Sequence, residues 1–133
     1  MKLRIKDQTI RLRLTQTEVD TLAQTGVVSA SIALAPGDAG TLTYEVAFSS
    51  SAAAVHVQFN ECIIRVEIPA NQGLAWAGSD QVGVANEAVP GATHPLHILV
   101  EKDFQCLHKR PHEDESDHFP HPLMAPSDQN PSA

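Results

Sequence analysis

The first fourteen residues of the chain constrain its fold more than any other segment. In the stretch KLRIKDQTIRLRL, apolar and basic side chains alternate on both sides of Asp7 and Gln8. A period of two is typical of a strand that buries one face and exposes the other. The stretch therefore predicts two antiparallel strands joined by a two-residue loop. Because this loop lacks the glycine usual in so tight a turn, a longer connection is the alternative.

A two-residue loop also predicts the pairing register of the two strands. Ile5 would face Ile10 on the inner side, and a slip of one residue would turn one strand's apolar side chains outward. Arg4 would face Arg11 on the outer side. The outer face would then gather four basic side chains, which are Lys2, Arg4, Arg11 and Arg13.

A helix is expected directly after this hairpin. Thr15 is a suitable N-cap, and Glu18 stands three residues later, where it can complete a capping box. Three apolar residues at helical spacing and a terminating glycine follow, namely Val19, Leu22, Ala23 and Gly26.

The rest of the body is dominated by strand patterns. Strands are expected at 27–35, 41–48, 53–59, 62–68, 81–85 and 94–101, with a short helical turn at 70–77 that packs Trp76 over a barrel mouth or a sheet edge. One helix among many strands predicts an α+β fold, either a curled antiparallel β-sheet or a barrel, with the helix after the first hairpin. The predicted body spans residues 1–104.

Composition favours one folded domain that neither binds nucleic acid in general nor spans a membrane. The chain has 133 residues and a net charge of −7, which argues against general nucleic-acid binding. The charged start is unlike a signal peptide, and no apolar run reaches the length of a membrane span. A cytoplasmic protein with reduced cysteines, Cys62 and Cys106, is therefore expected.

The character of the chain changes after Phe104. Several prolines interrupt regular structure, yet apolar residues such as Phe119 and Leu123 predict that 105–125 packs on the body. Residues 126–133 are expected to be a flexible tail. The acids of this segment, Glu113, Asp114, Glu115 and Asp117, carry charge opposite to the hairpin's, which predicts that the segment folds back onto the basic hairpin.

The run CLHKRPHEDESDHFPHP, which begins at Cys106, also suggests a metal site. Thiolate, imidazole and carboxylate ligands suit zinc or another divalent transition metal. No CxxC pair or HExxH motif is present, and the acids lack the EF-hand pattern. The candidate ligands are Cys106, His108, His112, Glu113, Asp117 and His118. A catalytic thiol at Cys106 is a weaker alternative, because neighbouring carboxylates oppose a thiolate.

Three short blocks carry a resemblance to known sequences, and two of them lie in the C-terminal part of the chain. EKDF-x-CL begins at Glu101, EDESD-x-FP begins at Glu113, and IRLRLT lies near the start. With these blocks the chain resembles an uncharacterised family of small bacterial proteins, a domain of unknown function. The resemblance implies that the two blocks form one family motif. The family form is closer to FPNP at its end, so His121 departs from it, which argues against an indispensable ligand there.

Three functions remain open from sequence. The first is a small soluble binding or accessory protein that binds a transition metal through its C-terminal segment. The second is an enzyme or binder that acts on a phosphate- or carboxylate-bearing small molecule through the basic hairpin. The third is a protein–protein adaptor that uses an exposed sheet edge. The sequence identifies no reaction, so whether the protein is an enzyme stays undecided.

Overall fold

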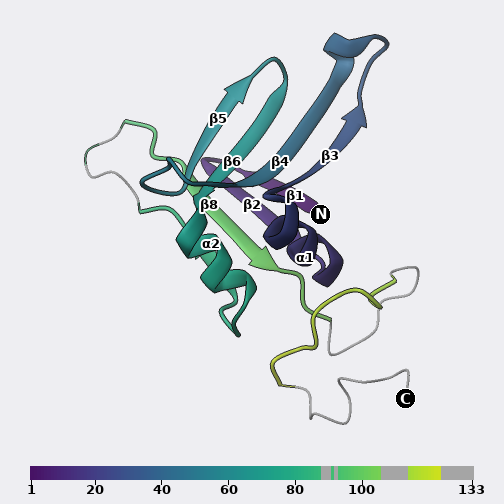
Figure 1. The fold of residues 1–133 in the computed structure, drawn as a ribbon. Helices are drawn as coiled ribbons and strands as arrows, with labels where there is room; N and C mark the ends of the chain where they lie inside the picture. Colours follow the sequence, from purple (N-terminus) through teal and green to yellow (C-terminus); the bar gives the residue numbers. More distant parts are fainter. Residues whose placement is uncertain (88–90, 92, 106–113, 124–133) are drawn as a thin grey trace.

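Two helices and two four-stranded sheets build the protein in the computed structural model, which describes residues 1–87, 91, 93–105 and 114–123 (Figure 1). The fold is α+β, as expected. In chain order the elements are β1 (Lys2–Lys6), β2 (Thr9–Leu14), α1 (Gln16–Thr25), β3 (Val27–Ala33), the 3-10 turn η1 (Asp38–Gly40), β4 (Thr41–Ser49), β5 (His56–Asn60), β6 (Ile63–Pro69), α2 (Ala70–Ala77), β7 (Gly83–Ala85) and β8 (His97–Lys102).

The first sheet has the strand order β1-β2-β8-β7. The predicted hairpin register is confirmed, because Ile5 pairs with Ile10 and Arg4 pairs with Arg11. Asp7 has a φ of 50° in the two-residue loop, a left-handed conformation that aspartate tolerates better than most residues. β2 pairs in parallel with β8, although these strands are far apart in sequence. This sheet is therefore mixed rather than purely antiparallel.

The second sheet has the order β3-β4-β6-β5. After β4 the chain forms the edge strand β5 and then returns as β6, which lies between β4 and β5. As a result, β4 and β6 are parallel. The expectation of one continuous antiparallel sheet or barrel is thus corrected. The described strands divide into two separate mixed sheets, and neither closes into a barrel.

The predicted helix after the hairpin is confirmed as α1, with both of its local end signals. Thr15 and Glu18 form the capping box, and Gly26 ends the helix with a φ of 84°. Val19 and Leu22 are buried, whereas Ala23 is exposed.

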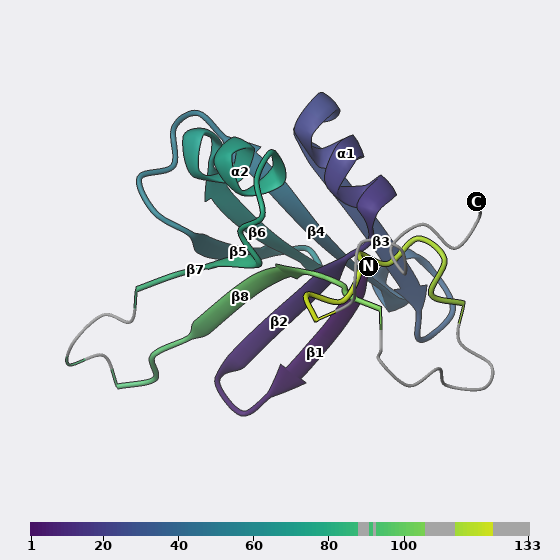
Figure 2. The ribbon, with the colours of Figure 1, turned by 90° about the horizontal axis from the view of Figure 1, so that it is seen from below.

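The short helical turn expected at 70–77 is the second helix, α2, with the same bounds. Trp76 is fully buried in the core instead of covering a sheet edge, and its indole Nε1 donates to the Val82 carbonyl at 3.1 Å. Gly73 allows α2 to approach β4, because a Cβ on this residue would lie 2.3 Å from the Phe48 ring. Figure 2 shows α1 and α2 side by side against the second sheet.

One hydrophobic core joins the two sheets and both helices. Leu12, Leu14, Val46, Val66 and Val100 are all fully buried. Among the described residues, neither helix has the length and apolar character needed to cross a bilayer.

Candidate functional site

The outer surface of the β1–β2 hairpin carries five cations at every second position. We call it the basic face, and it consists of Lys2, Arg4, Lys6, Arg11 and Arg13. The ladder places Lys2 opposite Arg13 and Arg4 opposite Arg11. Directly opposed like charges destabilise a sheet unless anions lie nearby.

Glu101 on β8 supplies one such anion. Its carboxylate Oε1 accepts a hydrogen bond from Nε of Arg13 at 2.8 Å and another from Nε of Arg11. Glu101 is only 8% exposed, so the two arginines shield it from water. One buried carboxylate therefore holds both cations of β2 in place.

Arg4 and Lys6 are the basic-face residues of β1 that line a shallow concavity. The concavity has a volume of about 320 Å³ and is lined by Arg4, Lys6, Asp7, Thr9 and Arg11. Arg4 and Lys6 are exposed, and within the described ranges neither forms an ion pair. Among the described residues, three cations and one carboxylate, that of Asp7, line this hollow.

A second charged cluster lies where β8 ends. Asp103 is 4% exposed, and its Oδ2 lies 3.2 Å from Nζ of Lys2 and 3.5 Å from Nε2 of His118. The His118 ring is also buried, with Nδ1 at 3.9 Å from Oε2 of Glu115. Close polar contacts of Asp103 therefore connect the N-terminal strand, the end of β8 and the C-terminal segment.

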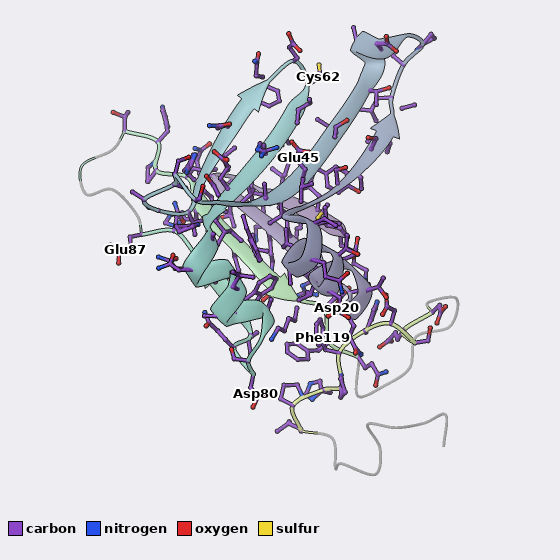
Figure 3. The ribbon with its side chains drawn as sticks, viewed as in Figure 1. Asp20, Glu45, Cys62, Asp80, Glu87 and Phe119 are labelled. Atoms are coloured by element: carbon purple, nitrogen blue, oxygen red, sulfur yellow. The ribbon has the colours of Figure 1, made fainter. Side chains whose placement is uncertain are left out.

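The described part of the C-terminal segment, residues 114–123, packs on the body. The backbone N–H of Phe119 donates to the Asp103 carbonyl at 2.8 Å, and that of Gln105 donates to the Phe119 carbonyl at 2.6 Å. The rings of Phe104 and Phe119 are 5.9 Å apart. Figure 3 shows Phe119 beside the end of β8, below the two helices. The EKDF block and residues 114–120 of the EDESDHFP block therefore meet in space.

Asp117 binds the first turn of α1. Its Oδ1 accepts hydrogen bonds from the backbone N–H and the hydroxyl of Thr17, at 3.2 and 3.0 Å, and its carbonyl accepts from Gln16 N at 2.9 Å. Together with the capping box, these contacts supply acceptors for the free N–H groups of the helix start. Residues 114–123 thus contact the body, and Asp117 binds the helix rather than the basic face.

Lys102 is an unusual buried cation. The residue is 5% exposed, and its Nζ donates to the Ser79 carbonyl at 2.5 Å. The same nitrogen lies 5.9 Å from the centre of the Trp76 ring and 5.5 Å from that of Phe119. Burial lowers the pKa of Lys102 below its usual 10.5, while the charge of Asp80 acts in the opposite direction.

The predicted metal ligands divide into two groups. Cys106, His108, His112 and Glu113 lie outside the described residues. Asp117 and His118 are described, and they contact α1 and Asp103 respectively. Among the residues that the structure describes, no three His, Cys, Asp or Glu side chains are grouped so as to hold a metal ion. A metal site in this segment stays a prediction.

A larger cleft is lined by residues from both sheets, and no sequence pattern indicates it. It has a volume of about 650 Å³, with an apolar floor that includes Val55 and Ile98. Its polar rim consists of His56, Gln72, Asn86, Glu87 and His94. Glu87 projects from the loop after β7 (Figure 3). The rim residues come from segments that only the tertiary fold brings together, so no spacing in the sequence marks them.

The described residues form a small α+β protein whose first hairpin carries the basic face. Comparison with known families places the chain more narrowly. It matches the family of unknown function DUF7009 over residues 1–123, and it therefore belongs to that family. No curated protein and no solved structure gave a significant match.

Proposed function

We propose that the protein binds an anionic group, a phosphate or a carboxylate, on the basic face of its first hairpin. The observation that supports this proposal most directly is the Arg4–Arg11 pair. The two arginines are opposed in the ladder, yet only Arg11 has a carboxylate partner among the described residues. A ligand anion between them would relieve their repulsion.

The side chains around the concavity offer suitable donors. Arginine presents a planar fork that matches the oxygens of phosphate and carboxylate groups. Arg11 contacts Glu101 through Nε, and its two terminal nitrogens make no hydrogen bond to any described residue, so they could bind a ligand. Lys6 adds a mobile point charge, and the Thr9 hydroxyl is a further donor. We propose binding rather than catalysis because these groups supply charge recognition without a nucleophile–base pair.

Titration with inorganic phosphate at low ionic strength tests this proposal. Backbone amide shifts of 15N-labelled protein should change at residues 4–11, and added salt should reverse the change. Replacing Arg4 with Gln should weaken binding at least about tenfold, because a hydrogen bond to a charged group is worth about 1.5–3 kcal/mol.

Arg65 provides a matched control on the other sheet. It is held by Glu45 at 3.0 Å and by Glu67 at 3.6 Å, so Arg65→Gln removes one positive charge far from the concavity. Equal weakening by both variants would mean that phosphate responds only to net charge. That result, or an absence of shifts at residues 4–11, would contradict the proposal.

A second candidate function is transition-metal binding by the C-terminal segment. The density of thiol, imidazole and carboxylate side chains between Cys106 and His118 favours it. Because four of the six candidate ligands lie outside the described residues, this candidate depends on the sequence pattern alone.

A further inference from the structure

β1 forms one edge of the first sheet. It pairs with β2 only, and within the described residues its backbone makes no hydrogen bonds on its other side. Figure 2 shows β1 as the outermost strand beside β2. Such an edge presents a row of unpaired N–H and C=O groups that another extended chain can bond.

The outward side chains of β1 define which chain would fit. Lys2, Arg4 and Lys6 occupy every second position on the basic face. In a sheet, residues on adjacent strands that face each other lie about 4.5–5.5 Å apart at Cβ. A strand added to this edge would therefore place a side chain opposite each cation, and acidic side chains would give the most favourable contacts.

The opposite face of β1 sets a second requirement. Ile5 is 58% exposed, although its ladder partner Ile10 is only 8% exposed. Leu3, the other inward residue of β1, is partly buried. An apolar side chain on the added strand would cover Ile5 and remove its exposed surface from water, which favours binding.

We infer that the partner of this site is an extended peptide segment in which acidic and apolar residues alternate. It would add to β1 as a fifth strand of the first sheet, with its acids opposite Lys2, Arg4 and Lys6. This inference rests on the proposed anion binding and names the partner that would supply the anions. Backbone hydrogen bonds would contribute affinity, and the alternating side chains would contribute selectivity.

Two other occupants fit the edge less well. A second copy would place β1 against β1, and the opposed lysines and arginines would repel each other. Charged residues on edge strands also protect proteins against such self-pairing. A nucleic acid would satisfy the cations, but it would leave the β1 backbone groups and Ile5 without partners.

A five-residue peptide, acetyl-Glu-Val-Glu-Val-Glu-amide, provides the probe. Its binding to full-length 15N-labelled protein should shift the β1 amides and slow the hydrogen exchange of those that do not bond β2. Two N-methylated peptides test both possible strand registrations. One is methylated at the two valine nitrogens and the other at the three glutamate nitrogens, because either set of N–H groups can point toward β1. One of these two peptides should bind about tenfold more weakly, because each lost backbone bond contributes about 0.5–1.5 kcal/mol.

Two variants separate the charge requirement from the apolar one. Lys6→Gln should weaken the binding of both the peptide and inorganic phosphate. Ile5→Thr keeps strand propensity and charge, so it should weaken peptide binding severalfold and leave phosphate binding unchanged. A peptide of the same composition with its acids in one block, Val-Val-Glu-Glu-Glu, should bind less well than the alternating one.

The outcomes distinguish this inference from the proposed function. If phosphate binds but the peptide does not change the hydrogen exchange of the β1 amides, the proposed anion site is supported and the inference of strand addition is wrong. If neither binds, both proposals fail. If both N-methylated peptides match the parent, or if a single-stranded oligonucleotide binds more tightly than the peptide, the partner is not an added strand.

Discussion

Glu101 and Arg13 lie opposite each other in the parallel β2–β8 pair, although 88 residues separate them in sequence. The carboxylate of Glu101 is shared with Arg11, and Glu101 is only 8% exposed. Two half-exposed guanidinium groups therefore depend on one enclosed anion for their position.

Replacing Glu101 with Gln should lower stability and increase anion affinity. The amide would leave two arginines without a counter-charge, which we expect to reduce the free energy of unfolding by about 1–2 kcal/mol, given that both arginines are partly solvated. Phosphate should bind more tightly because its internal competitor is gone. Urea unfolding and phosphate titration measure the two effects. Glu45→Gln, which removes one of the two carboxylate partners of Arg65 on the second sheet, should not change phosphate affinity.

Asp117 should be required for docking of the C-terminal segment. Asp117→Ala removes the acceptor of the Thr17 N–H and hydroxyl at the start of α1, and loss of such a cap costs about 0.5–2 kcal/mol. We expect faster proteolysis within residues 114–123 and a lower melting temperature. Asp114→Ala is the matched control, because Asp114 is exposed and its hydrogen bond to Ser116 N is local. Equal effects of the two variants would contradict a specific role for Asp117.

Metal binding by the C-terminal segment predicts one bound ion in untagged protein. Native mass spectrometry after zinc repletion should show a stoichiometric complex that chelation removes. Cys106→Ser should abolish it, because a serine hydroxyl is a much poorer zinc ligand than a thiolate. Cys62→Ser is the control, since Cys62 is an exposed free cysteine in the turn between β5 and β6. Absence of stoichiometric metal, or loss of metal in both variants, would dismiss the site.

Local signals in the sequence predicted local structure well. The hairpin register follows from the alternation around Asp7 and Gln8, and the bounds of α1 follow from the Thr15–Glu18 box and Gly26. Each of these signals involves residues within a few positions of one another, where sterics and hydrogen bonding have few alternatives.

Non-local features could not be predicted in the same way. The parallel β2–β8 pair brings Glu101 to the arginines, and periodicity alone contains no information on which distant strands pair. The charge pattern suggested that Asp117 would bind the hairpin, whereas the structure places it at α1. A helix start requires individual acceptors for individual N–H groups, and a count of opposite charges does not reveal that requirement. The cleft near His56 and Glu87 likewise depends on how the two sheets separate.

Lys102 should make stability depend on alkaline pH. Because burial lowers its pKa in the folded state, the folded protein releases this proton before the unfolded chain does. Between the lowered pKa and 10.5, the unfolded state binds more protons, so the contribution of Lys102 to the free energy of unfolding rises with pH. Lys102→Met keeps the side-chain length and removes this dependence. The stability of Lys102→Met relative to the native protein should therefore fall as the pH increases through that range. Urea unfolding at several pH values measures the difference, and Leu99→Met on the same strand should show no such trend. A difference between Lys102→Met and the native protein that stays constant, or rises with pH, would mean that the buried amine is not held at a lowered pKa by its surroundings.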